Sequence, residues 1–166
     1  PGGLGSFDAA QCYDCIVHLF CSMGAQAWGM PLSAIFCLLL AIQTMCFFLR
    51  TGYGDSDKSY GGTREDPFQG VCQGNGAGPG LWLCVCSFIV AHLRKSGHAV
   101  SIFSAITNTL LAIAAFLFVD DCDTLAEGKD EYEVRNKLQG SSETWSGGLR
   151  VTGGYLRPTK CFWQMV

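Results

Sequence analysis

"FLFVDDCDTL", residues 116–125, is the stretch that decides the fold of this chain. An apolar run over 110–119 ends there in two adjacent carboxylates, Asp120 and Asp121, and no basic residue stands beside them. Paired carboxylates at contact distance cannot both stay ionised cheaply, whereas a bound cation would neutralise them. We therefore predict that the apolar run is a buried strand and that its acidic tip binds a divalent metal. Asp123 is expected to be an ordinary solvated residue on the returning strand.

Asp8 is the candidate partner for this acid pair. Carboxylate oxygens suit Mg²⁺, and two-metal phosphoryl transfer needs a further carboxylate from another strand. Asp8 follows an aromatic residue and precedes a predicted helix in "SFDAAQCYD", residues 6–14. Taken alone, Asp8 could simply cap a helix that starts near Gln11, and the acid pair could lie in an ordinary turn. The metal prediction therefore depends on the acids occurring together and in order.

The composition is that of one globular domain. The chain has 166 residues, of which 49% are hydrophobic and 15% are charged, which argues against disorder. Its net charge of −3 gives no general attraction for nucleic acid, so a nucleic-acid function must rest on a local site. Most of the ten cysteines lie in apolar segments, and we expect them to be buried thiols of a reduced, intracellular protein. From its two ends we expect the chain to be a piece of a longer protein.

Apolar periodicity and turn residues predict the other elements. They are a helical face over Cys12–Trp28, a helix over 32–43, a hairpin of strands 44–51 and 59–63, a glycine-rich loop over 61–80, a helix from Pro79 to Gly97 and a polar helix over 129–145.

A membrane protein is the alternative that the long apolar segments raise. These segments are 32–49, 81–93 and 101–119, of which only two approach the ~18 residues that a spanning helix requires. Polar residues interrupt both, and basic residues do not flank them consistently. We predict no membrane span, and a small membrane-associated helical protein without catalysis stays as the alternative.

A second signal resembles a zinc site. Cys12, Cys15, His18 and Cys21 recur at three-residue steps. On a helix such steps spread the side chains around the circumference, so they cannot converge on one ion. We predict buried thiols and a histidine on the helix surface in place of a zinc site.

Four motifs, in order along the chain, resemble the palm motifs of reverse transcriptases, particularly those of retrotransposons. They are "FDAAQCYD" at 7–14, "QGNGAGP" at 73–79, "FVDD" at 118–121 and "GGYLRPTKC" at 153–161. Gly78 stands where the family has serine. The matching residues are Asp8, Tyr13 and Asp14; Gln73, Gly74 and Pro79; Phe118, Val119, Asp120 and Asp121; and Gly154 and Lys160.

This resemblance implies an α+β fold, a polymerase palm formed by residues 1–166. Its antiparallel sheet would carry Asp8 and Asp120 on neighbouring strands, with helices packed on one face, incomplete fingers and no thumb. The implied function is RNA-directed DNA polymerisation as part of a retroelement polyprotein. Its partners would be an RNA or DNA template with primer, dNTPs, and the fingers and thumb regions outside this chain. The chain alone is not expected to be active, and an inactive palm that serves as a structural or binding module is a further alternative.

The resemblance also implies a role for each matching acid. Asp8, Asp120 and Asp121 would be the catalytic residues and the ligands of two Mg²⁺ ions, with Mn²⁺ as a possible substitute.

Nucleotide-binding roles follow in the same way. Tyr13 would lie beneath the incoming sugar and exclude a 2′-hydroxyl. Gln73 and Gly74 would lie against template and nucleotide, because glycine lets backbone approach a ligand closely. Lys160 would contact the triphosphate or protonate the leaving pyrophosphate, although it could equally be a solvated surface lysine.

Overall fold

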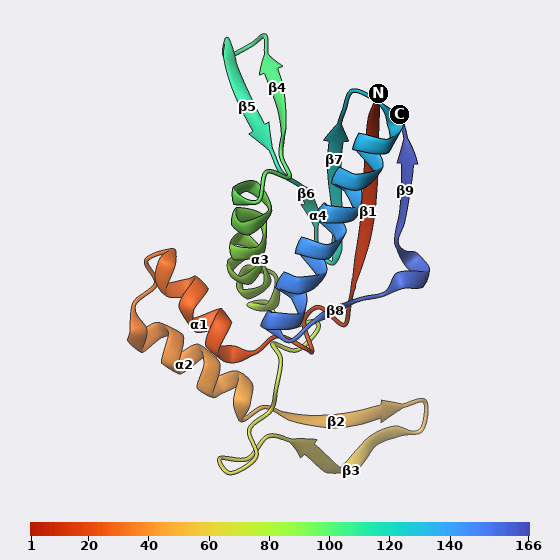
Figure 1. Ribbon diagram of the computed structural model, residues 1–166. Helices are drawn as coiled ribbons and strands as arrows, with labels where there is room; N and C mark the ends of the chain where they lie inside the picture. Colours follow the sequence, from red (N-terminus) through yellow and green to blue (C-terminus); the bar gives the residue numbers. More distant parts are fainter. The chain divides into compact units, whose positions relative to one another are not determined.

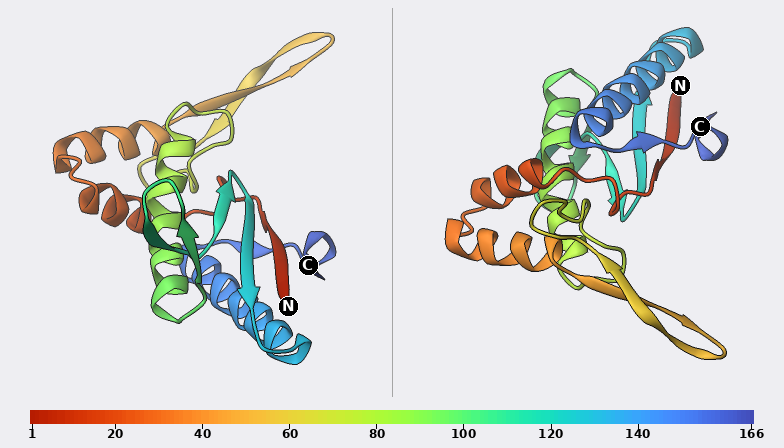
Figure 2. Two further views of the ribbon diagram at one scale, coloured as in Figure 1. Left: turned by 90° about the horizontal axis from the view of Figure 1, so that it is seen from above. Right: turned by 90° about the horizontal axis from the view of Figure 1, so that it is seen from below.

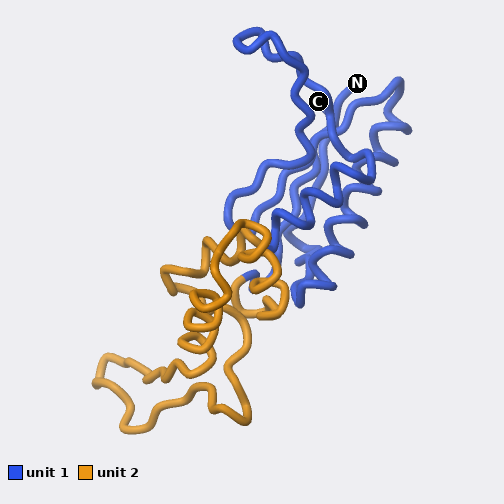
Figure 3. Tube along the Cα trace, turned by 90° about the vertical axis from the view of Figure 1, so that its left-hand side faces the viewer, with its two compact units in different colours: residues 1–12, 85–166 blue, residues 13–84 orange.

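The computed structural model describes residues 1–166, which divide into two compact units (Figure 3). The first unit consists of residues 1–12 and 85–166, and the second consists of residues 13–84.

The first unit is built on an antiparallel sheet of five strands. Strands β6, β7, β1 and β8 follow one another in that order, and β9 also pairs with β1 (Figure 1). Because the first strand of the chain lies between strands from its last third, the sheet joins segments that are distant in sequence. The bounds are β1 Gly2–Ala10, β6 Phe116–Phe118, β7 Asp121–Glu127, β8 Tyr155–Leu156 and β9 Phe162–Met165.

Helix α4, Glu131–Thr152, covers one face of this sheet (Figure 2). Asp130 caps its first turn by accepting a hydrogen bond from the Glu133 backbone N–H at 2.8 Å, and Gly153 in the left-handed conformation ends it. The polar helix predicted over 129–145 is therefore found, with these caps at its ends, and it extends beyond residue 145. The helix buries Val134, Leu138, Trp145 and Leu149.

Glycines in β1 allow α4 to lie close to the sheet. A Cβ atom at Gly3 would stand 2.7 Å from Val134 Cγ1 and 2.9 Å from Leu138 Cδ1. A Cβ at Gly5 would meet the Phe7 ring at 2.9 Å. Because side chains alternate along a strand, the odd positions of β1 face α4 and the even positions, including Asp8, face the opposite side of the sheet.

The prediction of one buried strand over 110–119 is wrong. The run is split between β5, Thr109–Ile113, and β6, and β5 pairs only with β4, Val100–Ser104, in a two-stranded ribbon. Asn108 turns this ribbon with a φ of 53°. The apolar side chains of the ribbon stay largely in solvent, because a two-stranded sheet offers no second layer to cover them.

Helix α3, Gly78–Lys95, includes the boundary between the two units. Its end is the predicted one, since Gly97 has a φ of 80° and its N–H bonds to Arg94 O at 3.2 Å. Within the first unit, Ile89 packs against α4, where a Cβ at Gly148 would lie 2.6 Å from Ile89 Cγ2.

The second unit contains two helices and a β-hairpin. The helix predicted over 32–43 and the existence of a hairpin are confirmed, but the returning strand starts earlier than residue 59. The elements are α1 His18–Ala27, α2 Leu32–Gln43, β2 Cys46–Thr51 and β3 Gly54–Gly61.

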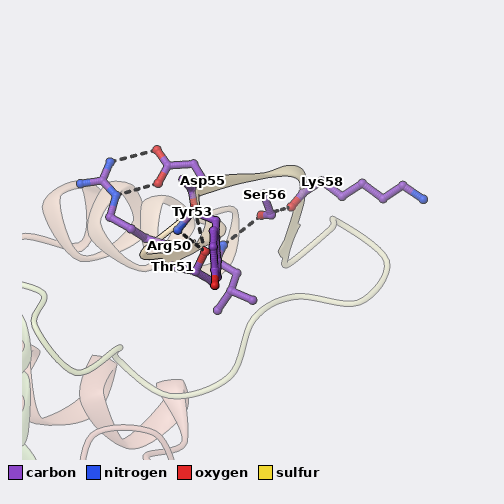
Figure 4. A network of polar contacts seen from close by, with 8 residues as sticks. Arg50, Thr51, Tyr53, Asp55, Ser56 and Lys58 are labelled. Carbon is purple, nitrogen blue, oxygen red and sulfur yellow. Dashed lines mark hydrogen bonds and ion pairs between the residues drawn. The ribbon is translucent and has the colours of Figure 1, made fainter.

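The hairpin tip is held by polar contacts (Figure 4). Arg50 forms a two-pronged ion pair with Asp55, with N···O distances of 2.6 and 2.9 Å. Ser56 Oγ accepts from Leu49 N–H at 3.0 Å and donates to Lys58 O at 2.7 Å. Because these groups are exposed, they fix the local geometry more than they stabilise the fold.

The predicted helical face over Cys12–Trp28 is only partly correct. Helix α1 begins at His18, and the side of it that is buried carries His18 and Cys21, whereas Leu19 is 63% exposed. His18 therefore does not lie on the surface as predicted. Its Nε2 bonds to Gly70 O, which can only accept, so the imidazole donates there and its Nδ1 accepts from Gln43 Nε2 at 2.8 Å. These bonds satisfy a polar group that burial would otherwise penalise.

None of the helices α1 to α4 combines the length and the apolar character that a membrane-spanning segment requires.

Candidate active site

The pairing of β1 with β7 brings the sequence-predicted acids together in the first unit. Asp8 stands directly opposite Asp121, and Ala9 N–H donates to Asp120 O at 3.0 Å. Directly opposed residues on antiparallel strands have Cα atoms only about 4.5–5.5 Å apart. The three acids therefore meet at one end of the sheet.

The turn between β6 and β7 differs from the predicted strand tip. Phe118 pairs with Asp121, so Val119 and Asp120 form a two-residue hairpin turn. Val119 has a φ of 55°, which a β-branched residue rarely adopts but which such a turn requires. Asp120 thus lies in the turn, and Asp121 is the acid that begins the strand.

Asp123 joins the acids on the same face of the sheet. It lies on the returning strand, as predicted, opposite Ser6, and strand alternation puts it on the face that carries Asp121 and Asp8. From the sequence we expect only an ordinary solvated residue there, and Asp123 is not grouped with the other acids. The signal that could have placed it is its spacing of two residues from Asp121.

Lys160 is the cation that the structure brings to this acid cluster. Its Nζ lies 3.1 Å from Asp8 Oδ2, and the Asp8 side chain is 11% exposed. Lys160 ends the short helix η1, Pro158–Lys160, which follows a direct backbone bond from Arg157 N–H to Asp8 O at 3.0 Å. This contact does not test whether Lys160 contacts a triphosphate, and the alternative of a solvated surface lysine also stays open, because the Lys160 side chain is 54% exposed.

The negative charges of the acid cluster are only partly balanced by nearby positive charge. The pKa of Asp121 is raised, first by its partial burial and then by the charges of Asp120, Asp8 and Asp123. Lys160 acts in the opposite direction on the same pKa. A further cation at this end of the sheet would therefore be stabilised by the protein.

Beneath the acids lies a packed layer on the other face of the sheet. Phe7 pairs with Cys122, and both side chains are buried. Burial raises the pKa of the Cys122 thiol and of the neighbouring Cys86 thiol, so both stay protonated. This layer holds the strands that carry Asp8 and Asp121 without adding charge.

The side chains of Asp8, Asp120 and Asp121 offer the kind of donor atom that a divalent metal ion binds. Carboxylate oxygens are the hard ligands that Mg²⁺ prefers. As the side chains stand, however, no three His, Cys, Asp or Glu side chains in residues 1–166 form a group that could hold a metal ion. A metal set built from Asp8, Asp120 and Asp121 therefore requires side-chain rotation, and one Asp8 oxygen is engaged by Lys160.

The predicted nucleotide-binding residues other than Lys160 belong to the second unit. Tyr13 O accepts from Val71 N–H at 2.7 Å, which joins the first motif to the loop of the second motif. Gln73 and Gly74 are exposed, and Gly74 has a φ of 88° in open surroundings. A Cβ at Gly78 would lie 3.5 Å from the Tyr13 ring, so the serine that the family has there would fit.

No protein-family model and no curated protein matches the chain. Among solved structures, it is similar to apo telomerase from Candida tropicalis truncated from its C-terminal domain, with a TM-score of 0.62 and 17% identity over 98% of this chain and 30% of that one. It is also similar to telomerase from the same organism in complex with a TWJ fragment of telomeric RNA, with a TM-score of 0.61, 14% identity and coverage of 98% and 26%.

These likenesses establish the class of fold. Telomerase is a polymerase related to reverse transcriptases, so the chain has a reverse-transcriptase-like, mixed α/β fold with antiparallel sheets. The fold does not single out the retrotransposon type. The chain spans less than a third of the length of the two telomerase chains, 30% and 26%.

Proposed function

We propose that the chain is the palm part of an RNA-directed DNA polymerase of a retroelement. In this role it joins dNTPs to a primer 3′-hydroxyl on an RNA or DNA template, together with fingers and thumb regions outside this chain. The observation that supports the proposal most is the register that sets Asp8 opposite Asp121, with Asp120 hydrogen-bonded through its carbonyl to the same strand. The reverse-transcriptase-like fold is the second support.

The acids would act by holding metal. Asp8 and Asp120 would ligate two Mg²⁺ ions, or Mn²⁺, and Asp121 would support them by its charge. When bound, the ions would activate the primer 3′-hydroxyl and stabilise the charge of the leaving pyrophosphate. Asp8 is suited to a fixed ligand because its strand lies inside the sheet, between β7 and the strands β8 and β9.

The remaining residues would bind and select the nucleotide. The Tyr13 ring would lie under the sugar and exclude a 2′-hydroxyl, which selects deoxynucleotides. Gln73 and Gly74, in their exposed turn, would lie against template and nucleotide. Lys160 would donate a hydrogen bond or a proton to the triphosphate. We place the protein in an intracellular, reducing environment, which accords with its ten free cysteines.

The test is to replace the corresponding segment of a complete polymerase of this family with residues 1–166. Incorporation of dNTPs on a primed RNA template is then measured with the unchanged segment, with Asp120→Asn and with Asp57→Asn, which removes an exposed acid of β3. We expect Asp120→Asn to abolish incorporation and Asp57→Asn to preserve it. Equal incorporation with all of the segments would contradict the proposed catalysis.

A catalytically inactive palm is the second candidate. It is favoured by one observation, namely that no three acidic or thiol or imidazole side chains stand ready to hold a metal. In that case the chimaeric polymerase would bind its primer and template but incorporate nothing, with or without the aspartate substitutions.

A further inference from the structure

The contact between Lys160 and Asp8 is the observation from which a further role can be inferred. The two residues are 152 positions apart, and their side chains meet at 3.1 Å. The Asp8 side chain is 11% exposed and the Lys160 side chain is 54% exposed, so the carboxylate is fixed in the sheet while the ammonium reaches in from solvent.

The backbone around Lys160 is held independently of this ion pair. Arg157 N–H donates to Asp8 O at 3.0 Å, and Lys160 N–H donates to Arg157 O at 2.9 Å. The flexible lysine stem can therefore swing away while the short helix η1 keeps its place beside β1. A lysine is suited to such exchange, because its ammonium is a strongly hydrated point charge on a rotatable four-carbon stem.

A divalent cation and the ammonium compete for the Asp8 carboxylate, because two positive charges held on one carboxylate repel each other. Lys160 is also the one positive group that opposes the mutual repulsion of the acids around Asp121. We infer that Lys160 is an internal counter-ion, which neutralises Asp8 in the metal-free chain and is displaced when a divalent cation binds. This inference rests on the proposed function, because it assumes that Asp8 is a metal ligand. Once displaced, the ammonium is free to meet the triphosphate, so the lysine becomes available only when the metal is present.

Binding of Mn²⁺ to the whole chain tests the exchange. Free Mn²⁺ is measured by electron paramagnetic resonance during titration of MnCl₂ into the unchanged chain, Lys160→Met, Lys160→Arg, Asp8→Asn and Lys137→Met. Lys137 is a matched control, because it is also a half-exposed lysine in an ion pair, at 2.8 Å from Glu133, in the same unit but away from Asp8. Lys137→Met removes the same charge without touching the acid cluster.

We expect Lys160→Met to bind Mn²⁺ about five-fold more tightly than the unchanged chain. The free energy of a partly exposed ion pair corresponds to a change in affinity of about this size. Lys137→Met and Lys160→Arg should leave the affinity nearly unchanged, and Asp8→Asn should lose the site. Tighter binding by Lys160→Met together with loss of binding by Asp8→Asn supports the exchange. Equal or weaker binding by Lys160→Met, with Asp8→Asn still losing the site, overturns the exchange and leaves the proposed metal site standing. Absence of Mn²⁺ binding in every variant overturns both.

Thermal unfolding supplies a readout that does not depend on measured affinity. In EDTA, Lys160→Met should melt a few degrees lower than the unchanged chain, about 2–4 °C, because the acids lose their counter-ion. MnCl₂ should raise the melting temperature of Lys160→Met more than that of the unchanged chain. An equal rise in both overturns the exchange. Lys160→Gln serves as a second uncharged variant if Lys160→Met does not fold.

Discussion

At the scale of single residues, Asp121 is destabilised by its neighbours. Its pKa is raised by partial burial and by the nearby acids. Folding thus favours its protonated form, so this contribution to stability is present below the ordinary pKa of about 3.9 and is lost as the pH rises through the raised value. Asp121→Asn should raise the free energy of unfolding at neutral pH. The gain should be a few tenths of a kcal/mol, because the side chain is exposed.

Denaturant unfolding of the metal-free chain at neutral pH and at about pH 3 measures this effect. The gain from Asp121→Asn should vanish at the acidic pH, where the wild-type carboxyl is protonated as well. Asp57→Asn, which removes the same charge from the exposed hairpin, should change little at either pH. A gain that persists at acidic pH would show that electrostatic repulsion is not its source.

Val119 is the residue with the clearest backbone strain near the site. Its φ of 55° suits a two-residue hairpin turn but not a β-branched side chain. Val119→Gly and Val119→Asn should each raise the free energy of unfolding, by roughly 0.5–1 kcal/mol, because both residues tolerate positive φ. Calorimetric melting of the two variants checks this, with Val119→Ala as the control that keeps a Cβ and should gain much less. A loss of stability in both would mean that the Val119 side chain contributes more than its strain costs.

At the scale of elements, the close approach of α4 to β1 decides the stability of the first unit. A methyl group at Gly3 of β1 would stand 2.7 Å from Val134 Cγ1 of α4. A methyl group at Gly147, which is also in α4, would meet nothing within 4 Å. Gly3→Ala should therefore destabilise the chain by about 1–3 kcal/mol through overpacking. Gly147→Ala should stabilise it by about 0.5–1 kcal/mol through helix propensity. Opposite signs in urea unfolding are the expected result, and a neutral Gly3→Ala would mean that α4 can move outward freely.

The elements that could be predicted from sequence are those with local end signals. Gly97 marks a helix end by its own chemistry, and this prediction is confirmed. The polar helix predicted from residue 129 is also found, and Asp130 is the cap that starts it. The run 110–119 has no such signal, and its apolar composition cannot say whether a second layer covers it. Likewise, the histidine of α1 is buried because Gly70 and Gln43 come from elsewhere in the chain to satisfy it. The apolar periodicity of a segment contains no information about hydrogen-bond partners that are distant in sequence.

At the scale of the whole molecule, the candidate site is assembled from three distant segments. The order of the motifs predicts that Asp8 and the acid pair are near one another, and the sheet register places them so. The contact of Lys160 with Asp8 could not be predicted, because it depends on how Arg157 is bonded to β1. The spacing of two residues between Asp121 and Asp123 puts both on one face only if a single strand includes them, and the sequence did not show that β7 begins at Asp121.

The net charge of the whole chain affects how strongly its binding to nucleic acid depends on salt. The chain carries 11 basic and 14 acidic residues, so phosphate contacts by bulk charge are few. Binding of a primed RNA template should therefore depend weakly on monovalent salt, with a log–log slope shallower than about −3. Mg²⁺ should strengthen the binding, because it neutralises the acids that would otherwise repel the phosphates. Fluorescence anisotropy of a labelled template measures the slope in a titration with KCl, and it measures the effect of Mg²⁺ at constant ionic strength. Asp120→Asn should remove the strengthening and Asp57→Asn should keep it, whereas a steep salt slope together with weaker binding in Mg²⁺ would indicate a basic surface in place of the acidic site.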